Sequence, residues 1–95
     1  MSRDCVPVAL FRLGRIVATP NALQSIPNEE ILNAIQRHQG GDWGMLESED
    51  KNSNDRALNS GGRIFSAYVA PDGTKFWIIT EADRSVTTVL LPEDY

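Results

Sequence analysis

The chain has 95 residues, 41% of them hydrophobic, which suits one folded domain over residues 1–95 rather than a disordered segment. Its net charge of −4, without clustered Lys and Arg, argues against sequence-independent binding to phosphate backbones. Cys5 is the only cysteine, which excludes intramolecular disulfides and cysteine-based metal sites and predicts a soluble, cytoplasmic protein.

The first residues of the chain show neither a helical nor a strand period in their hydrophobicity, so residues 1–8 are expected to form a flexible leader. They hold no apolar run long enough for a signal peptide or a membrane span. A strand is expected from Leu10 to Ala18, in which Gly14 is predicted to mark a bulge or a close approach of two backbones. Thr19 could then cap one turn of helix that ends at Ser25.

The clearest helix is predicted to begin at Pro27, because proline suits the first helical position and two glutamates follow in the first turn. Gly40 and Gly41 are expected to end it. Three apolar residues and one histidine recur at helical spacing and predict the buried face: Ile31, Leu32, Ile35 and His38.

Ser48 is predicted to cap a second helix, which starts with Glu49 and Asp50 in its first turn and ends at Gly61-Gly62. Asp50 and Asn54 are four residues apart and would share one face of this helix with neighbouring leucines. We therefore expect a polar pair that is partly buried and hydrogen-bonded.

The stretch from Arg63 to Leu91 predicts two antiparallel hairpins. Alternating and β-branched residues indicate three strands, at 63–69, 74–80 and 85–91. Pro71-Asp72-Gly73 suits a type I turn followed by a left-handed glycine, and 81–84 forms the second connection. The predicted fold is α+β: a small antiparallel sheet, made of this three-stranded meander plus the N-terminal strand, with two helices packed on one face.

The pattern of polar residues predicts no catalytic, cofactor-binding or metal-binding residue. His38 has Asp42, Glu47 and several serines near it in sequence, so a hydrolase centred on His38 is one alternative, but the Gly-x-Ser-x-Gly motif is missing. The carboxylates lack metal-ligand spacing, and the glycine pairs lack a phosphate-binding pattern. The protein is therefore expected not to be an enzyme and to need no cofactor.

Two loops are candidates for contact with a protein partner. The first holds Asp42 and Trp43, although burial in the protein's own core explains the Trp43 ring more readily. The second is the turn with Glu81, Asp83 and Arg84, for which the alternative is a solvated turn braced by an internal Asp–Arg pair.

A nucleic-acid surface is the alternative to a protein-binding one. Tyr68, Phe76 and Trp77 lie on neighbouring predicted strands and could make a face on which bases stack, with Tyr68 and Trp77 as its contacts. Basic residues do not gather around these aromatic residues, so nucleic acid is the less favoured partner.

Three segments carry a family resemblance: Gly41-Asp42-Trp43-Gly44, the run from Asp72 to Ser85, and the run from Thr87 to Glu93. From Leu13 to Tyr95 the chain resembles small bacterial plasmid-related proteins, which are sometimes labelled type I restriction subunits. The resemblance implies carriage on plasmids and other mobile elements and assigns no activity to any residue. A chain of this size has no room for the methyltransferase cofactor fold that a restriction subunit would need.

The expected function is that of a small cytoplasmic interaction protein of bacterial mobile elements. It would modulate a host DNA-processing or defence enzyme by binding it, and the alternative is a weak nucleic-acid-binding module with an aromatic sheet face. A homodimer is also expected, because a four-stranded sheet of this size exposes its edges.

Overall fold

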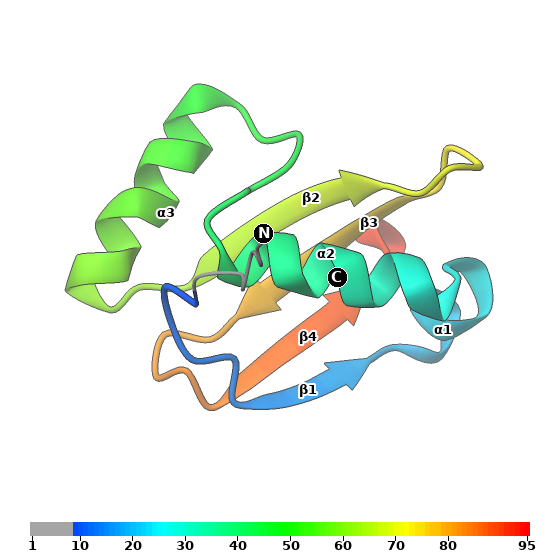
Figure 1. The fold of residues 1–95 in the computed structure, drawn as a ribbon, viewed down its shortest axis with the longest axis horizontal. Helices are drawn as coiled ribbons and strands as arrows, with labels where there is room; N and C mark the ends of the chain where they lie inside the picture. Colours follow the sequence, from blue (N-terminus) through cyan, green and yellow to red (C-terminus); the bar gives the residue numbers. More distant parts are fainter. Residues whose placement is uncertain (1–8) are drawn as a thin grey trace, which may run out of the picture.

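A computed structural model describes residues 9–95, so the leader expected at residues 1–8 lies outside the described residues (Figure 1). One four-stranded sheet has the strand order β1-β4-β3-β2. Its strands are β1 (Arg15–Ala18), β2 (Ile64–Val69), β3 (Lys75–Thr80) and β4 (Val86–Leu90). The helices are α1 (Pro20–Ser25), α2 (Asn28–Gln39) and α3 (Ser48–Ser60), followed after β4 by a 3-10 turn, η1 (Pro92–Asp94).

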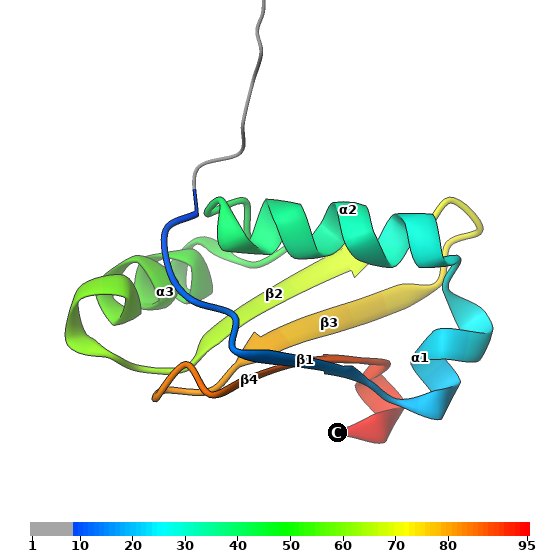
Figure 2. The same cartoon turned by 60° about the horizontal axis from the view of Figure 1, so that its bottom comes forward.

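The helices and the sheet form two layers, and the two faces of the sheet are covered unequally. Figure 2 shows α2 lying over one face of the sheet, whereas η1 lies on the opposite face. Helix α3 packs beside β2, and α1 turns the chain from the end of β1 into α2. Within residues 9–95, no helix has the length and apolar character needed to cross a bilayer. The α+β class predicted from the sequence is confirmed.

The sheet is mixed, and this corrects the expectation of an antiparallel one. The meander from β2 to β4 is antiparallel as predicted, but β1 runs parallel to β4, with Arg15 opposite Val86. Parallel neighbours require a long crossover. The chain supplies one, because α1 and α2 carry it from β1 over the covered face before the meander begins.

Gly14 explains why β1 starts at Arg15 and not at Leu10. Its φ is +64°, and a Cβ atom there would lie 2.4 Å from the carbonyl oxygens of Arg84 and Ser85. The close approach of two backbones predicted at this glycine is therefore confirmed. The Arg15 N–H then donates to the Ser85 carbonyl, which opens the parallel ladder.

Helix α2 begins one residue after Pro27 and buries a stripe at helical spacing: Ile31, Ala34, Ile35 and His38. Leu32 was expected on this face but is 62% exposed. It lies about 100° around the helix from Ile31, outside the stripe that residues 31, 35 and 38 define. Ala34 takes its place, because a small side chain lets the helix approach the sheet.

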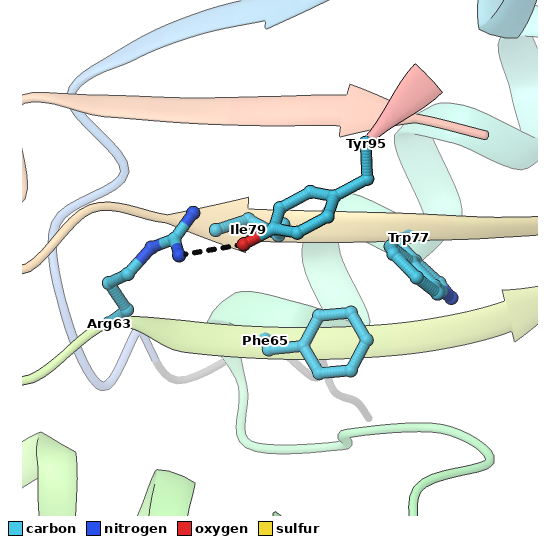
Figure 3. Close-up of a pocket in the computed structure, with 5 residues that line it drawn as sticks. All are labelled: Arg63, Phe65, Trp77, Ile79 and Tyr95. Carbon is cyan, nitrogen blue, oxygen red and sulfur yellow. Dashed lines mark hydrogen bonds between the residues drawn. The ribbon is translucent and has the colours of Figure 1, made fainter. Parts of the chain in front are cut away.

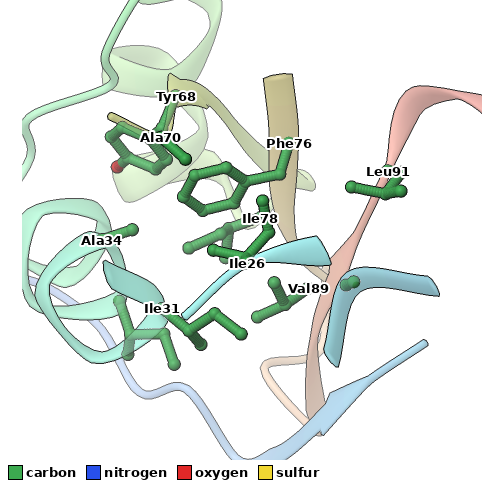
Figure 4. Close-up of a cluster of buried hydrophobic side chains, with 11 residues drawn as sticks. Ile26, Ile31, Ala34, Tyr68, Ala70, Phe76, Ile78, Val89 and Leu91 are labelled. Carbon is green, nitrogen blue, oxygen red and sulfur yellow. The ribbon is translucent and has the colours of Figure 1, made fainter. Parts of the chain in front are cut away.

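The main core lies between α2 and the sheet (Figure 4). Phe76, Ile78 and Val89 project from β3 and β4 toward Ile26, which follows α1. Full burial of one such side chain contributes about 1.5–3 kcal/mol to the stability of the fold. The buried residues of this main core are Ala22, Ile26, Ile31, Ala34, Ile35, Tyr68, Ala70, Phe76, Ile78, Val89 and Leu91.

A second, smaller cluster joins α3 to the sheet through Trp43, Ala57 and Ile64. The prediction that Trp43 enters the protein's own core is confirmed, since it is 4% exposed. Its indole Nε1–H donates to Asp55 Oδ1 at 3.1 Å, so the buried polar atom is satisfied.

Asn54 closes the outer edge of β2. Its side-chain amide acts like the backbone of a fifth strand: Nδ2 donates to the Phe65 carbonyl at 2.6 Å, and Oδ1 accepts from the Phe65 N–H at 3.1 Å. Further along, the Met45 N–H donates to the Ala67 carbonyl, and the Ala67 N–H donates to the Trp43 carbonyl. The sequence predicted a buried polar pair of Asp50 with Asn54, but Asp50 is exposed and Asn54 pairs with β2 instead.

Replacing Asn54 by Asp is expected to destabilise the fold by about 2 kcal/mol, because the carboxylate cannot donate and leaves the Phe65 carbonyl unpaired. Asn52→Asp on the exposed side of α3 is the matched control and should change stability by less than about 0.5 kcal/mol. Urea unfolding of both variants measures the difference. Equal effects would mean that the paired amide does not stabilise the edge.

Candidate functional site

The face of the sheet opposite α2 carries an aromatic pocket, which we call the aromatic face: Arg63, Phe65, Trp77, Ile79 and Tyr95 (Figure 3). The cavity that they line has a volume of about 250 Å³. Of the described elements, only η1 lies on this side of the sheet. The aromatic face is therefore an accessible, largely apolar surface of the sheet.

Strand register brings two of the three rings together. Phe65 pairs with Ile79 and Trp77 with Ala67, so Phe65 and Trp77 are diagonal neighbours on one face. Their ring centroids are 5.0 Å apart at an interplanar angle of 89°, the edge-to-face arrangement that aromatic pairs favour. The two rings thus form a preformed wall of the pocket.

Tyr95 forms the third side, because η1 folds the chain back beneath β3. Its ring centroid lies 5.8 Å from that of Trp77, and the residue remains 71% exposed. Arg63 donates to the Tyr95 hydroxyl at 3.1 Å and pairs with Glu81 at 3.3 Å. The bond with Tyr95 and the Glu81 carboxylate raise the pKa of Arg63, so a fixed cation stands at the rim of the apolar pocket.

The predicted pairing of Tyr68 with Trp77 on one stacking face is wrong. Tyr68 pairs with Phe76 across β2 and β3, which puts both rings on the covered face, and Tyr68 is 2% exposed. Its hydroxyl donates to the Asp42 carbonyl at 2.7 Å, and burial raises its pKa to about 12. Phe65 takes the place expected for Tyr68 beside Trp77.

The first loop proposed for partner contact divides between core and surface. Trp43 is buried, so its ring offers no contact surface. Asp42 is exposed and pairs with Arg37 at 2.7 Å, and this bond lowers the pKa of the Asp42 carboxyl. Both residues of this loop are therefore engaged within the protein, Trp43 in the core and Asp42 with Arg37.

The second loop is braced by Arg84 in a way that the sequence did not predict. Arg84 has a left-handed φ of 61°. Its guanidinium donates to the carbonyls of Gly62 at 2.6 Å and Ala57 at 3.0 Å, and also to Glu81 and Ala82 in its own turn. The expected Asp–Arg pair is replaced by bonds from Ser85 to Asp83.

Arg84 therefore ties the C-terminal end of α3 to the turn between β3 and β4. A cation at this position also complements the negative end of the helix dipole. The N–H groups of Arg84 thus bond to carbonyls of the protein itself. Asp83, by contrast, is exposed, and Glu81 lies at the rim of the aromatic face.

His38 lies at the centre of a buried polar chain. Its Nδ1 is 2.6 Å from Ser66 Oγ, and its Nε2 is 2.9 Å from Thr80 Oγ1. Thr80 Oγ1 is 2.7 Å from Thr87 Oγ1, which donates to the Leu13 carbonyl. Every link of the chain runs between α2, the three strands of the meander and the segment before β1.

The Leu13 carbonyl sets the direction of this chain, because a carbonyl only accepts. Thr87 donates to it, Thr80 donates to Thr87, and His38 Nε2–H therefore donates to Thr80. Ser66 then donates to Nδ1, which assigns the neutral Nε2–H tautomer to His38. With both ring nitrogens engaged and the residue fully buried, this geometry favours a structural role over that of a hydrolytic base.

Between residues 9 and 95, no three or more His, Cys, Asp or Glu side chains cluster as a metal ion would require. Comparisons with protein-family models, curated proteins and solved structures found no match.

Proposed function

We propose that this chain is a binding protein that acts by docking its aromatic face on a partner protein, without chemistry of its own. The observation that carries the proposal is the pocket of about 250 Å³ between Phe65, Trp77 and Tyr95, with Arg63 at its rim. Small-molecule pockets usually begin at about 300 Å³, so this one suits a single large apolar or aromatic side chain of the partner.

The residue types support this proposal, since tryptophan, tyrosine and arginine are enriched among the side chains that dominate binding energy at interfaces. Phe65 and Trp77 are held by the strands, so little conformational entropy is lost when a partner docks. Tyr95 and the Arg63–Glu81 pair provide a polar rim around the apolar centre.

The biological setting of the proposal comes from the resemblance to plasmid-related proteins. We place the binding protein in the bacterial cytoplasm, where it would meet the host enzymes that process or restrict the DNA of a mobile element. We propose such an enzyme as the partner, with its activity modulated by occupation of the surface that the aromatic face covers.

Trp77→Ala is expected to weaken partner binding by at least about 2 kcal/mol, or roughly thirtyfold, because it removes the central wall of the pocket. The measurement is capture from bacterial lysate followed by affinity determination with the purified partner. Leu32→Ala removes an equally apolar and more exposed side chain from α2, on the other side of the sheet, and should bind normally. Full binding by Trp77→Ala would rule out the aromatic face.

A second candidate function is stacking of single-stranded nucleic acid on the same rings. It is favoured by one observation: Phe65 and Trp77 lie on a face that no α-helix covers, and sheets that bind single strands also present aromatic side chains on such a face. The acidic Glu81 at the rim disfavours it. Retention on single-stranded DNA or RNA at low salt, lost in Trp77→Ala, would support this function over the first.

A further inference from the structure

The two edge strands, β2 and β1, differ in whether their outward backbone groups have hydrogen-bond partners. On β2, Asn54 and the 43–45 segment occupy the outward backbone groups of Phe65 and Ala67. On β1, by contrast, β4 is the only neighbouring strand among the described residues. Figure 1 shows β1 at the lower border of the sheet, with β4 as its neighbour.

Register shows which groups this border presents. The N–H groups of Arg15 and Thr19 donate to Ser85 and Val89, so residues 15, 17 and 19 direct their backbone groups at β4. The N–H and C=O groups of Ile16 and Ala18 therefore point outward, and none of the backbone bonds within residues 9–95 uses them. Ile16 is 49% exposed, which leaves this edge both polar in its backbone and apolar in its side chains.

We propose that the β1 edge binds the β1 edge of a second copy of this chain, antiparallel, so that the two sheets become one. The register that pairs the outward groups of both residues places Ile16 opposite Ala18 of the second copy, Ala18 opposite Ile16, and Val17 opposite Val17 on the two-fold axis. Each Ile16–Ala18 pair exchanges two backbone hydrogen bonds.

Charge complementarity selects a second copy as the occupant. In this register Arg15 stands opposite Thr19 of the other copy, and cross-strand neighbours have Cβ atoms about 4.5–5.5 Å apart. The Thr19 hydroxyl donates to Asp94 at 2.7 Å, and Asn21 donates to the other carboxylate oxygen at 2.8 Å. A guanidinium reaching past Thr19 therefore meets a carboxylate that is already held in place.

Both partners of this ion pair lie on the same side of the sheet. Val17 pairs with Thr88, and Thr88 with Ile79 of the aromatic face, so Val17 and its alternate neighbours Arg15 and Thr19 share that side. Asp94 belongs to η1, which lies there too. The two-fold axis repeats the contact, giving two ion pairs, and it places the two aromatic faces on one side of the joined sheet.

Sedimentation equilibrium of the full chain at rising concentration tests the proposal. The mass is expected to rise from 10.5 kDa toward twice that value. Ile16→Pro removes an outward N–H and should keep the chain monomeric, because proline is tolerated on edge strands only where the N–H faces solvent. Val69→Pro makes the same change on the β2 edge and should leave the dimer intact. A wild-type chain that stays monomeric, or a dimer abolished by Val69→Pro and not by Ile16→Pro, would overturn the proposal.

The ion pair gives a second test that does not alter the backbone. Arg15→Glu is expected to weaken dimerisation about tenfold, since it places two carboxylates side by side. Adding Asp94→Asn to the same chain removes the second carboxylate, while the amide oxygen can still accept from Thr19, and should recover part of the loss. A double variant that dimerises no better than Arg15→Glu alone would overturn the proposed register, and circular dichroism of each variant confirms that it is folded.

Discussion

Lowering the pH from 7 to 4 is expected to reduce the free energy of unfolding by about 3 kcal/mol through His38 alone. Burial of the ring, reinforced by the positive charge of Arg84, lowers its pKa from 6.5 to about 4. In the unfolded chain the imidazole takes up a proton near pH 6.5, whereas the folded chain resists protonation until about pH 4. The unfolded state therefore binds more protons in this window, so stability falls as the pH drops and levels off below it.

The directional hydrogen-bond chain explains why the folded state resists the proton. A proton on Nδ1 would face Ser66, whose hydroxyl already donates to that nitrogen, so Ser66 would have to reorient inside the core. Hydrogen bonds lower the pKa of the Asp72, Asp83 and Asp94 carboxyls below the ordinary value of 3.8. These carboxylates stabilise the folded state above pH 3.8, and that contribution to the free energy of unfolding is lost only as the pH falls below this value. The contribution of His38 is lost earlier, between pH 6.5 and 4.

Urea unfolding at several pH values measures this slope, and His38→Gln provides the control. Glutamine keeps a donor and an acceptor but cannot titrate, so the slope between pH 6.5 and 4 should largely disappear. A slope that persists in His38→Gln would assign the acid sensitivity to other groups. The imidazole resonances of the wild-type chain should likewise show no titration until the pH approaches 4.

Gly44→Ala is expected to destabilise the fold by more than about 3 kcal/mol. Gly44 has a φ of +75°, and a Cβ atom there would lie 1.9 Å from the Ala67 carbonyl oxygen. The 43–45 segment would have to leave the β2 edge and lose its backbone bonds with Ala67. Both the left-handed strain and the lost bonds contribute to the expected effect.

Gly61→Ala is the matched control for this substitution. Gly61 also has a left-handed φ, +87°, but nothing lies within 4 Å of its Cβ position. It should show only the conformational strain, about 1–2 kcal/mol. Chemical denaturation compares the two variants, and equal losses would show that the 43–45 segment shifts without cost. Faster hydrogen exchange of the Ala67 amide in Gly44→Ala would locate the damage at the edge.

Much of the fold was readable because its signals are local. The turn at Pro71-Asp72-Gly73 forms as predicted, with the Gly73 N–H donating to the Ala70 carbonyl and a φ of +91° at Gly73. Helix α3 likewise ends at a left-handed Gly61 as predicted, but it begins one residue earlier than expected, because Glu47 and not Ser48 is its N-cap residue. The parallel pairing of β1 with β4 was not readable, because residues so far apart in sequence leave no local pattern that names their partner.

Only part of the aromatic face could be predicted from the sequence. A turn centred on residues 71–73 pairs Trp77 with Ala67, so the alternation already places Phe65, and not Tyr68, beside Trp77. Tyr95 had no such signal, because its position depends on the bonds of Asp94 to Thr19 and Asn21. The role of Arg84 was equally hidden, since it bonds to carbonyls of another element.

The parallel ladder between β1 and β4 also has a consequence for the order of folding. Everything that the N-terminal half packs against, namely β2, β3 and β4, is made after it. Until a ribosome has added residues 86–90, β1 has no neighbouring strand to bond, and α2 can cover only the β2–β3 hairpin. The complete native sheet can therefore form only after β4 has been synthesised.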